Sequence, residues 1–323
     1  MRILITGGGG FVGLKLARAL AMKGKLRDRA ISEITLADLK APATRGFDLP
    51  VTGVALDMRD SAAVTATLAQ PFDVIFHLAA IVSGQAEADF DLGLEVNLFG
   101  TLNLFQAARS AGNCPVVVYA SSLAAHGGEE PEVIVDGLEL NPQTSYGTQK
   151  VIGELLLNDM SRRGMIDGRG MRLPTVSIRP GKPNAAASSF MSSIFRDTMQ
   201  GKPSNCPVAK DYPIYHTAPR TVVANLIHAA ELDGNAFGAN RNINLPGRTD
   251  TVAEMIAAMT LVAGPEPASR ITWNADPVIQ NIVAGWRGHV TPQKALRLGF
   301  TADQSFADTV RWFLEDDIVT ARQ

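Results

Sequence analysis

The stretch Met1–Thr6 (MRILIT), followed by Gly7–Gly13 (GGGGFVG), decides the fold of this 323-residue chain. The apolar residues before Gly7 predict a strand, and apolar positions at helical spacing over 14–22 predict a helix. The glycines therefore lie in a strand-to-helix turn. Because glycine permits positive φ and has no Cβ, backbone N–H groups there can approach a phosphate at the positive end of the helix.

The spacing of these glycines fits a dinucleotide. The pattern is G-x-x-G-x-x-G, and the predicted cofactor contacts within it are Gly7, Gly10, Phe11, Val12 and Gly13. An ordinary flexible turn can give the same letters, so a second signal is needed. Asp38 supplies it, because it ends the next apolar run at the distance where a carboxylate binds the adenosine ribose.

Asp38 also bears on which dinucleotide is bound. A carboxylate at this place repels the 2′-phosphate of NADP and therefore favours NAD. Lys40 and Arg45 follow closely and leave NADP open. The sequence predicts NAD as the cofactor.

The composition argues against several other classes of protein. Hydrophobic residues make up 46% of the chain and charged residues 19%, as in a folded enzyme. The formal net charge is −2 without a long Lys/Arg run, so we expect neither nucleic acid nor a membrane surface as a partner. Cys114 and Cys206 are too few for a disulfide framework and too isolated for a metal site. No apolar run approaches the ~18 residues that span a bilayer, and we expect a cytoplasmic protein.

Strands and helices alternate along the chain. Apolar runs predict the first five strands, at 1–6, 34–38, 51–56, 72–80 and 115–120. This order predicts the α/β class, with a Rossmann doubly wound parallel sheet and a smaller C-terminal α/β substrate lobe. We expect an NAD-binding domain over 1–181, to which 212–232 returns, and a substrate lobe over 182–211 and 233–323.

The fourth predicted strand leads to a ligand edge. It ends in Leu78, Ala79 and Ala80, whose size leaves room for a cofactor. We interpret His77 as a packed histidine, because no carboxylate stands next to it. Residues 81–87 are expected to form a polar loop that offers Ser83 and Gln85 to a substrate.

Tyr146 and Lys150 stand four residues apart, on one face of a predicted helix. A tyrosine with a pKa near 10 needs a shift of roughly 3 units, about 4 kcal/mol, to act as a base near neutral pH. A lysine ammonium ~4 Å away supplies about that much at an effective dielectric constant of ~20. Ser121 or Ser122, at the end of the preceding strand, can hold the reacting hydroxyl against the phenolate.

These features resemble the extended short-chain dehydrogenase/reductase family, the NAD-dependent epimerases and dehydratases, over nearly the whole chain. The resemblance rests on the order of the glycine turn, Asp38, Asp57, His77–Ala80, Asn97, Ser121–Ser122, Tyr146 and Lys150. It implies the Rossmann fold, NAD and catalysis by hydride transfer.

The resemblance also implies roles for single residues. In the family a serine five residues before a glycine is catalytic, which matches Ser122, with Ser121 as the alternative. An Asp-aliphatic pair holds the adenine, which matches Asp57 and Met58. An N-cap is the other interpretation of Asp57, but Asp60 fits that role better.

Two further positions follow from the same resemblance. Asn97 corresponds to an amide that lies behind the active site and fixes the surroundings of the catalytic lysine. Thr175 lies where relatives close the nicotinamide site. His126 departs from the tyrosine of many sugar-nucleotide enzymes and weakens any transfer of their substrate.

The segment after Thr175 suits an acidic substrate. Arg179, Lys182 and Asn184 offer donors that hold a carboxylate well, although each cation can equally be a solvated surface residue. Residues 142–159, 172–175 and 179–190 resemble family members that oxidise C2 of a short sugar acid.

Three other functions stay open. They are a sugar-nucleotide epimerase or dehydratase that retains NAD, a uronate-type dehydrogenase, and a redox-sensing binding protein. The intact Ser122, Tyr146 and Lys150 argue against the last.

Two predicted helices carry more apolar residues than one sheet face requires. They are the helix over 91–111 and the helix that carries Tyr146, where apolar residues spread around most of the circumference. In relatives these helices pair across a two-fold axis. We therefore expect a homodimer.

Overall fold

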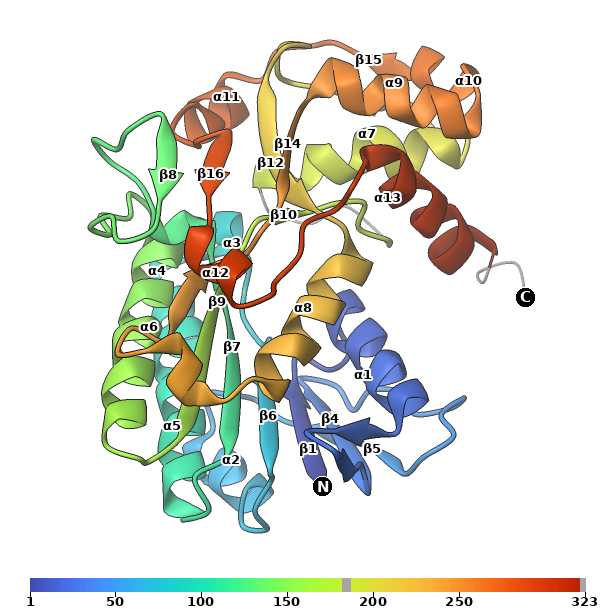
Figure 1. The fold of residues 1–323 in the computed structure, drawn as a ribbon. Coiled ribbons are helices and arrows are strands. Elements are labelled where there is room, and N and C mark those ends of the chain that lie inside the picture. Colours follow the sequence, from blue (N-terminus) through green and yellow to red (C-terminus); the bar gives the residue numbers. More distant parts are fainter. Residues whose placement is uncertain (182–186, 320–323) are drawn as a thin grey trace. The chain divides into compact units, whose positions relative to one another are not determined.

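The computed structural model describes residues 1–181 and 187–319. These residues form two compact units (Figure 1). Unit 1 comprises 1–126, 140–173 and 223–244, and unit 2 comprises 127–139, 174–222 and 245–323 as far as they are described.

Unit 1 is built on a seven-stranded parallel sheet in the order β13-β9-β7-β6-β1-β4-β5. Its strands are β1 (Arg2–Thr6), β4 (Glu33–Asp38), β5 (Val51–Ala55), β6 (Val74–His77), β7 (Val116–Ser122), β9 (Asp167–Leu173) and β13 (Asn242–Asn244). The strand order reverses beside β1, as in a doubly wound fold. The predicted fold class is confirmed.

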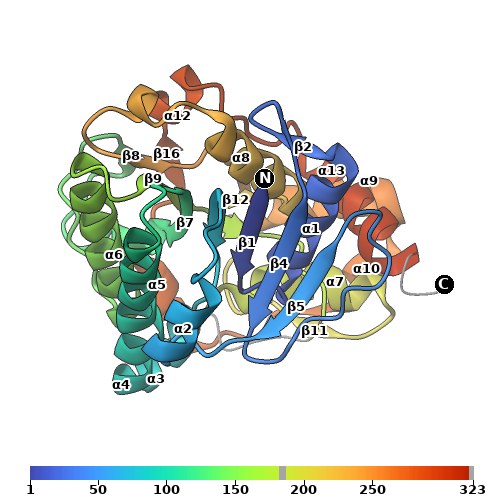
Figure 2. The same ribbon diagram turned by 90° about the horizontal axis from the view of Figure 1, so that it is seen from below.

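Helices cover both faces of this sheet (Figures 1 and 2). The α-helices that lie wholly in unit 1 are α1 (Phe11–Lys23), α2 (Ser61–Thr67), α3 (Ser83–Ala88), α4 (Phe90–Gly93), α5 (Gly100–Ser110) and α6 (Ser145–Arg162). Unit 1 also contains two short 3₁₀ turns, η2 (Leu123–Ala125) and η4 (Gly234–Phe237), and a small hairpin of β2 (Lys25–Leu26) and β3 (Arg29–Ala30). The side chains of α2, α5 and α6 share one buried apolar cluster with one face of the strands. Burial of that cluster holds these three helices against the sheet.

Two sequence-based expectations in unit 1 are corrected. The expected loop over 81–87 becomes α3 from Ser83 onward, because Ala86 packs fully buried against the unit. The expected single helix over 91–111 is interrupted by a π-helical turn, η1 (Leu94–Phe99), which contains the buried Asn97. Such turns insert one extra residue and often occur at functional sites.

Among its described residues, unit 2 contains three small sheets and several helices. Its strands are β8 (Val133–Val135), β10 (Thr175–Val176), β11 (Ser204–Asn205), β12 (Pro213–Thr217), β14 (Arg248–Thr251), β15 (Ile271–Thr272) and β16 (His289–Thr291). Its helices are α7 (Phe190–Met199), α9 (Val252–Ala263), α10 (Glu266–Ser269), α11 (Pro277–Ala284), α12 (Gln293–Arg297) and α13 (Phe306–Phe313), with η3 (Ala187–Ser189) and η5 (Leu314–Val319). A second apolar cluster, centred on Phe195, Met255 and Val310, holds α7, α9 and α13 together.

The unit boundaries differ from the expected domain boundaries. Residues 242–244 belong to unit 1, because β13 pairs with β9. Residues 127–139 belong to unit 2, because β8 pairs with β16. Helix α8 (Pro219–Glu231) begins in unit 2 and continues in unit 1.

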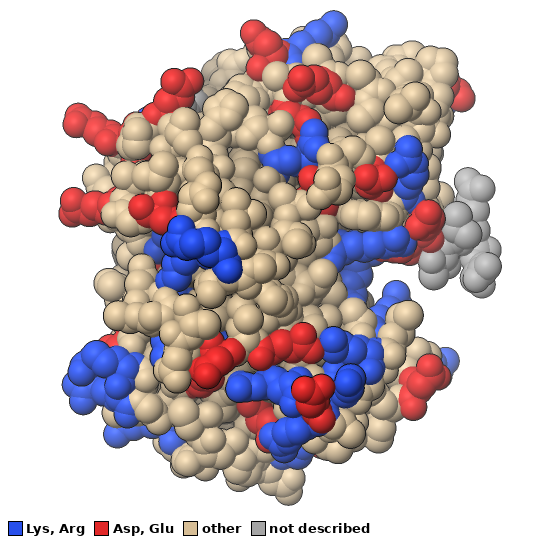
Figure 3. Space-filling view, in the orientation of Figure 1, with Lys and Arg blue, Asp and Glu red and all other residues tan. Residues whose placement is uncertain are grey.

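The surface carries charges of both signs. Figure 3 shows Lys and Arg side chains interspersed with Asp and Glu on one face, and neither sign covers it. Within the described residues, no helix combines the length and apolarity that crossing a membrane requires.

Candidate functional site

The glycine turn is shaped by close backbone approaches. Gly7 has a φ of 69°, and a Cβ there would lie 2.8 Å from the backbone nitrogen of Ala79. A Cβ at Gly13 would collide with the Gly7 carbonyl oxygen. Helix α1 follows Gly10, which provides no side-chain cap. Its first N–H groups therefore remain available to an anion.

Asp38 lies at the same turn. Its carboxylate accepts hydrogen bonds from the backbone N–H groups of Gly9 at 3.0 Å and Leu39 at 2.8 Å. The structure thus brings together the glycines, Asp38 and Ala79, as the sequence predicts for a dinucleotide site.

Asp57 is held by a neighbour. Arg59 forms an ion pair with it at 2.7 Å, and this arginine lowers the pKa of Asp57. Asp60 caps α2 by accepting from Ala63 N–H at 3.0 Å, so its predicted N-cap role is confirmed. Met58 is buried. Adenine binding by Asp57 and Met58 stays a prediction.

Ser122, Tyr146 and Lys150 come together in unit 1. Ser122 ends β7, and its side chain hydrogen-bonds the Tyr146 phenol. The Lys150 Nζ lies 5.5 Å from the centroid of the Tyr146 ring and donates to the Ala120 carbonyl oxygen at 2.8 Å. Ser121 points elsewhere, because its hydroxyl donates to Glu154 at 2.6 Å. The geometry therefore favours Ser122 over Ser121 as the partner of Tyr146.

The ionisation of the pair differs from the expectation. Burial raises the pKa of Tyr146 to about 12, and the Ser122 hydrogen bond offsets only part of that effect. Burial also lowers the pKa of Lys150 to about 8. The expected lowering of the Tyr146 pKa by a lysine ~4 Å away is therefore wrong for this structure, because desolvation dominates.

The start of α6 fixes Tyr146. Thr144 caps the helix by accepting from Gly147 N–H at 3.1 Å. A Cβ at Gly147 would collide with the Ala124 carbonyl oxygen, so this glycine lets α6 approach the end of β7. The approach brings Tyr146 to Ser122.

Asn97 is buried, and its side chain connects two segments of unit 1 by hydrogen bonds. Its Oδ1 accepts from Ile81 N–H at 2.9 Å, and its Nδ2 donates to Gln149 Oε1 at 2.8 Å. It thereby ties the chain after β6 to the helix that carries Lys150.

His77 is buried between the hydroxyls of Thr6 and Thr101, and burial lowers its pKa to about 3. The structure thus agrees with its interpretation as a packed, neutral histidine.

The other predicted site residues are spread over both units. Ser83 is the first residue of α3 in unit 1. Thr175 in unit 2 opens β10 and pairs with His216 of β12. Arg179 in unit 2 donates from Nη2 to Ser189 Oγ at 3.3 Å. Lys182 and Asn184 lie outside the described residues.

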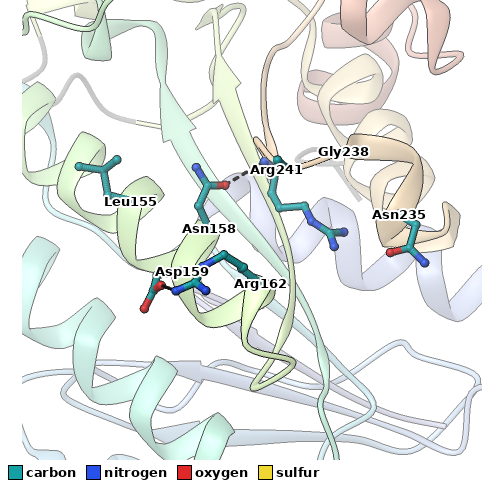
Figure 4. A pocket seen from close by; sticks show the side chains of 8 residues that line it. Leu155, Asn158, Asp159, Arg162, Asn235, Gly238 and Arg241 are labelled. Atoms are coloured by element: carbon teal, nitrogen blue, oxygen red, sulfur yellow. Dashed lines mark hydrogen bonds and ion pairs between the residues drawn. The ribbon is translucent and has the colours of Figure 1, made fainter.

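A pocket of about 480 Å³ lies elsewhere on unit 1 (Figure 4). It is lined by Leu155, Asn158, Asp159, Arg162, Asn235, Gly238, Ala239 and Arg241. Arg162 pairs with Asp159 within it, and none of the predicted site residues line it. It is therefore not the candidate active site.

Two polar groups around α6 are not among the predictions from the sequence. Gln149 binds Asn97, and Glu154 forms a buried ion pair with Arg172 at 2.7 Å. A charged residue one turn beyond Lys150, on a helix otherwise rich in apolar residues, was the available signal for Glu154.

Comparison with known proteins identifies the family. A model of the NAD dependent epimerase/dehydratase family matches residues 3–217. The chain belongs to this family. The predictions of an NAD-dependent enzyme of the dehydrogenase class, and of NAD as its cofactor, are confirmed.

Two similar curated proteins share a name. A D-erythronate dehydrogenase of Cupriavidus necator is 48% identical over 98% of this chain and 98% of its own length. A second D-erythronate dehydrogenase, of Haemophilus influenzae, is 41% identical over 98% of this chain and 100% of its own length. The resemblance to dehydrogenases of short sugar acids is thereby confirmed.

Solved structures agree on the fold. The structure of a nucleoside-diphosphate-sugar epimerase from Agrobacterium tumefaciens is 43% identical, covers 99% of this chain and 95% of its own, and superposes with a TM-score of 0.94. An L-threonine dehydrogenase from Cupriavidus necator superposes with a TM-score of 0.85 at 23% identity, covering 98% of this chain and 99% of its own. The second likeness bears on the fold only.

The residues of unit 1 fit NAD. The uncapped start of α1 beside Gly7, Gly10 and Gly13 offers N–H donors to a pyrophosphate. A side chain at Gly7 or Gly13 would fill the turn. Asp38 lies beside the turn, where its carboxylate could bind the ribose, and Lys150 contacts Ala120 of β7.

Proposed function

We propose that the protein oxidises D-erythronate at C2 to 2-dehydro-D-erythronate with NAD. The observation that carries the proposal is the contact of Ser122 with the Tyr146 phenol, with Lys150 against the same ring, in a chain 48% identical to a D-erythronate dehydrogenase. Ser122 orients the C2 hydroxyl, and Tyr146 accepts its proton as the general base. Bound NAD would supply the acceptor for the hydride that leaves C2.

Lys150 makes that proton transfer possible. With a pKa of about 12, Tyr146 is mostly a neutral phenol near neutral pH, so only the fraction that carries the phenolate can accept the proton, and that phenolate must be stabilised. The ammonium of Lys150 next to its ring provides that stabilisation. We infer that Lys150→Met loses both turnover and NAD affinity, because the same ammonium also serves the nicotinamide ribose.

The carboxylate of the substrate needs its own partner, and we infer that Arg179 provides it. Its guanidinium is partly buried, and burial together with the neighbouring Arg196 lowers its pKa. Arg196 is satisfied by an ion pair with Asp197 at 2.8 Å, whereas no ion pair joins Arg179 to a carboxylate among the described residues. A partly buried cation without a counter-ion among the described residues favours an anionic ligand. Lys182 and Asn184 are proposed as further donors from the sequence.

Kinetics on matched substrates test this contact. Arg179→Gln, or alanine at Lys182 or Asn184, should lower kcat/KM for D-erythronate by ~10- to 150-fold, the loss of one charge-assisted hydrogen bond. Erythritol, the neutral polyol, should be a poor substrate and lose little further. Lys202→Ala, an exposed cation of the same unit, is the control. Equal losses for acid and polyol would mean that these side chains do not bind the carboxylate.

A second candidate is favoured by one observation. The solved structure at 43% identity carries the name of a nucleoside-diphosphate-sugar epimerase, an activity that would retain NAD. Net NADH formation separates the two functions. Four- to six-carbon sugar acids, including uronates, should produce NADH, and nucleotide sugars should not. Product formation from a nucleotide sugar without net NADH would support the epimerase.

We also propose a homodimer in the cytoplasm. Phe99 of η1 and Leu155 of α6 are 50% and 62% exposed, although both are large and apolar. Val151, Ile152 and Leu156 on α6 are only partly buried. Such faces suit a bundle with a second copy. Light scattering at micromolar concentration should give twice the chain mass, and a monomer would reject the dimer.

A further inference from the structure

Lys150 lies among neutral groups. It is 2% exposed, and its Nζ donates to the Ala120 carbonyl oxygen and lies 4.9 Å from the centroid of the Tyr119 ring. The Tyr146 ring is the third neighbour, at 5.5 Å. No ion pair joins it to a carboxylate within the described residues. Its charge must therefore be stabilised from farther away.

One turn later on α6 stands a buried carboxylate. Glu154 is 1% exposed, and Ser121 Oγ donates to its Oε1 at 2.6 Å. Arg172 binds both of its oxygens, with Nε at 2.9 Å from Oε1 and Nη2 at 2.7 Å from Oε2. These donors fix the Glu154 side chain, which stands four residues after Lys150 on the same helix face. Glu154 is the one group that raises the pKa of Lys150 against the effect of burial.

Arg172 is held in turn by other strands. Its Nη1 donates to Asn244 Oδ1 at 3.3 Å, and the same oxygen lies 3.0 Å from His126 Nε2. Arg172 comes from β9, Asn244 from β13 and Glu154 from α6. The arginine therefore stays beside Glu154 and limits the negative potential that reaches Lys150.

We propose that Glu154 is a positioning residue of the active site, whose buried carboxylate holds Lys150 as an ammonium, and that Arg172 sets how strongly it does so. The inference rests on the proposed function, in which a charged Lys150 stabilises the Tyr146 phenolate. The titratable or charged groups around Lys150 are Tyr146 and Glu154 on α6, Tyr119 on β7 and His77 on β6. Arg172 on β9 follows, through its ion pair with Glu154.

The sign of each change follows from charge alone. Removing the carboxylate in Glu154→Gln favours neutral Lys150 and lowers its pKa. Removing the cation in Arg172→Met leaves Glu154 unopposed and raises the pKa of Lys150. If Glu154 and Arg172 only supported the fold, the two substitutions would not shift the Lys150 pKa in opposite directions.

NMR of the Lys150 side chain measures these pKa shifts and does not require the enzyme to turn over a substrate. The ¹³Cε resonance of Lys150 is titrated in full-length protein with labelled lysine, and Lys150→Met assigns the signal. We expect the Lys150 pKa to fall by about one unit in Glu154→Gln and to rise in Arg172→Met. Ser121→Ala, which keeps both charges, should leave it close to the wild-type value. An unchanged pKa, or a shift of the same sign in both charge variants, overturns the proposal.

Loss of one partner can unfold a buried ion pair. The double variant Glu154→Gln/Arg172→Met removes both charges of this ion pair together, so neither of the two partners is left charged without the other. It should lower the Lys150 pKa by less than Glu154→Gln, because the two removals oppose each other. A pKa in the folded double variant at or below that of Glu154→Gln would mean that Arg172 does not set the effect of Glu154 on Lys150.

The pH profile of NADH formation gives a second readout. Tyr146 and Lys150 titrate as a pair, and the active form contains the phenolate and the ammonium. In Glu154→Gln the acidic limb of kcat/KM should coincide with wild type, while the plateau falls ~10-fold and begins about one pH unit lower. A uniform loss at every pH overturns the proposal. If wild type oxidises no sugar acid, the proposed function fails, and the Lys150 titration still decides the role of Glu154.

Discussion

Helices α1 and α6 both start where strands of the unit 1 sheet end, yet their N-termini differ. Gly10 at the start of α1 offers no side-chain cap, and Thr144 at the start of α6 closes its helix with a hydrogen bond to Gly147. The open end leaves its donors for a phosphate, and the closed end satisfies its own donors and positions Tyr146. We therefore expect the N-terminus of α1 to bind a phosphate and the N-terminus of α6 to position Tyr146.

Of the variants that separate the roles of α1 and α6, we expect Tyr146→Phe on α6 to have the largest effect. Loss of the general base should lower kcat by at least ~10²- to 10⁴-fold, whereas the dissociation constant for NAD should stay close to wild type. Stopped-flow turnover and NAD titration measure the two effects. Comparable turnover in the variant would contradict the role of Tyr146.

A matched pair of glycine substitutions separates the two helix ends. In both Gly13→Ala and Gly147→Ala the new Cβ collides with a carbonyl oxygen, of Gly7 or of Ala124. Overpacking of this kind costs ~1–3 kcal/mol. Gly13→Ala should mainly weaken NAD binding, by ~5- to 150-fold, and Gly147→Ala should mainly lower kcat. If both variants lose NAD affinity equally, the two ends do not have separate functions.

Exchanging the caps gives the smallest effect. Thr144→Ala removes a cap worth ~1 kcal/mol and should lower the melting temperature by ~2–4 °C without weakening NAD. Gly10→Ser gives α1 a cap that competes with the phosphate, so NAD affinity should fall several-fold without loss of stability. Calorimetry and NAD titration on both variants measure this. Unchanged NAD affinity in Gly10→Ser would show that the open end is not a phosphate site.

The parts that could be predicted from the sequence are local. The strand-to-helix turn at Gly7–Gly13 and the face shared by Tyr146 and Lys150 depend on spacing over a few residues. The Asp60 cap is local in the same way. Short-range periodicity and capping rules are sufficient for such features.

The parts that could not be predicted depend on contacts distant in sequence. The pairing of β8 with β16 assigns 127–139 to unit 2, and no local pattern marks it. Glu154 and Arg172 lie on different elements and meet only after folding. The expected pKa of Tyr146 failed for a related reason, because the spacing of Tyr146 and Lys150 gives their common face but not the desolvation of both.

The most direct test of the central claim uses D-erythronate deuterated at C2. The account predicts that this deuterium appears on the reduced cofactor, that one NADH is released for each acid oxidised, and that Tyr146→Phe abolishes the transfer. Deuterium retained at C2, or a cofactor that returns to its oxidised form without net NADH, would contradict oxidation at C2 by this site.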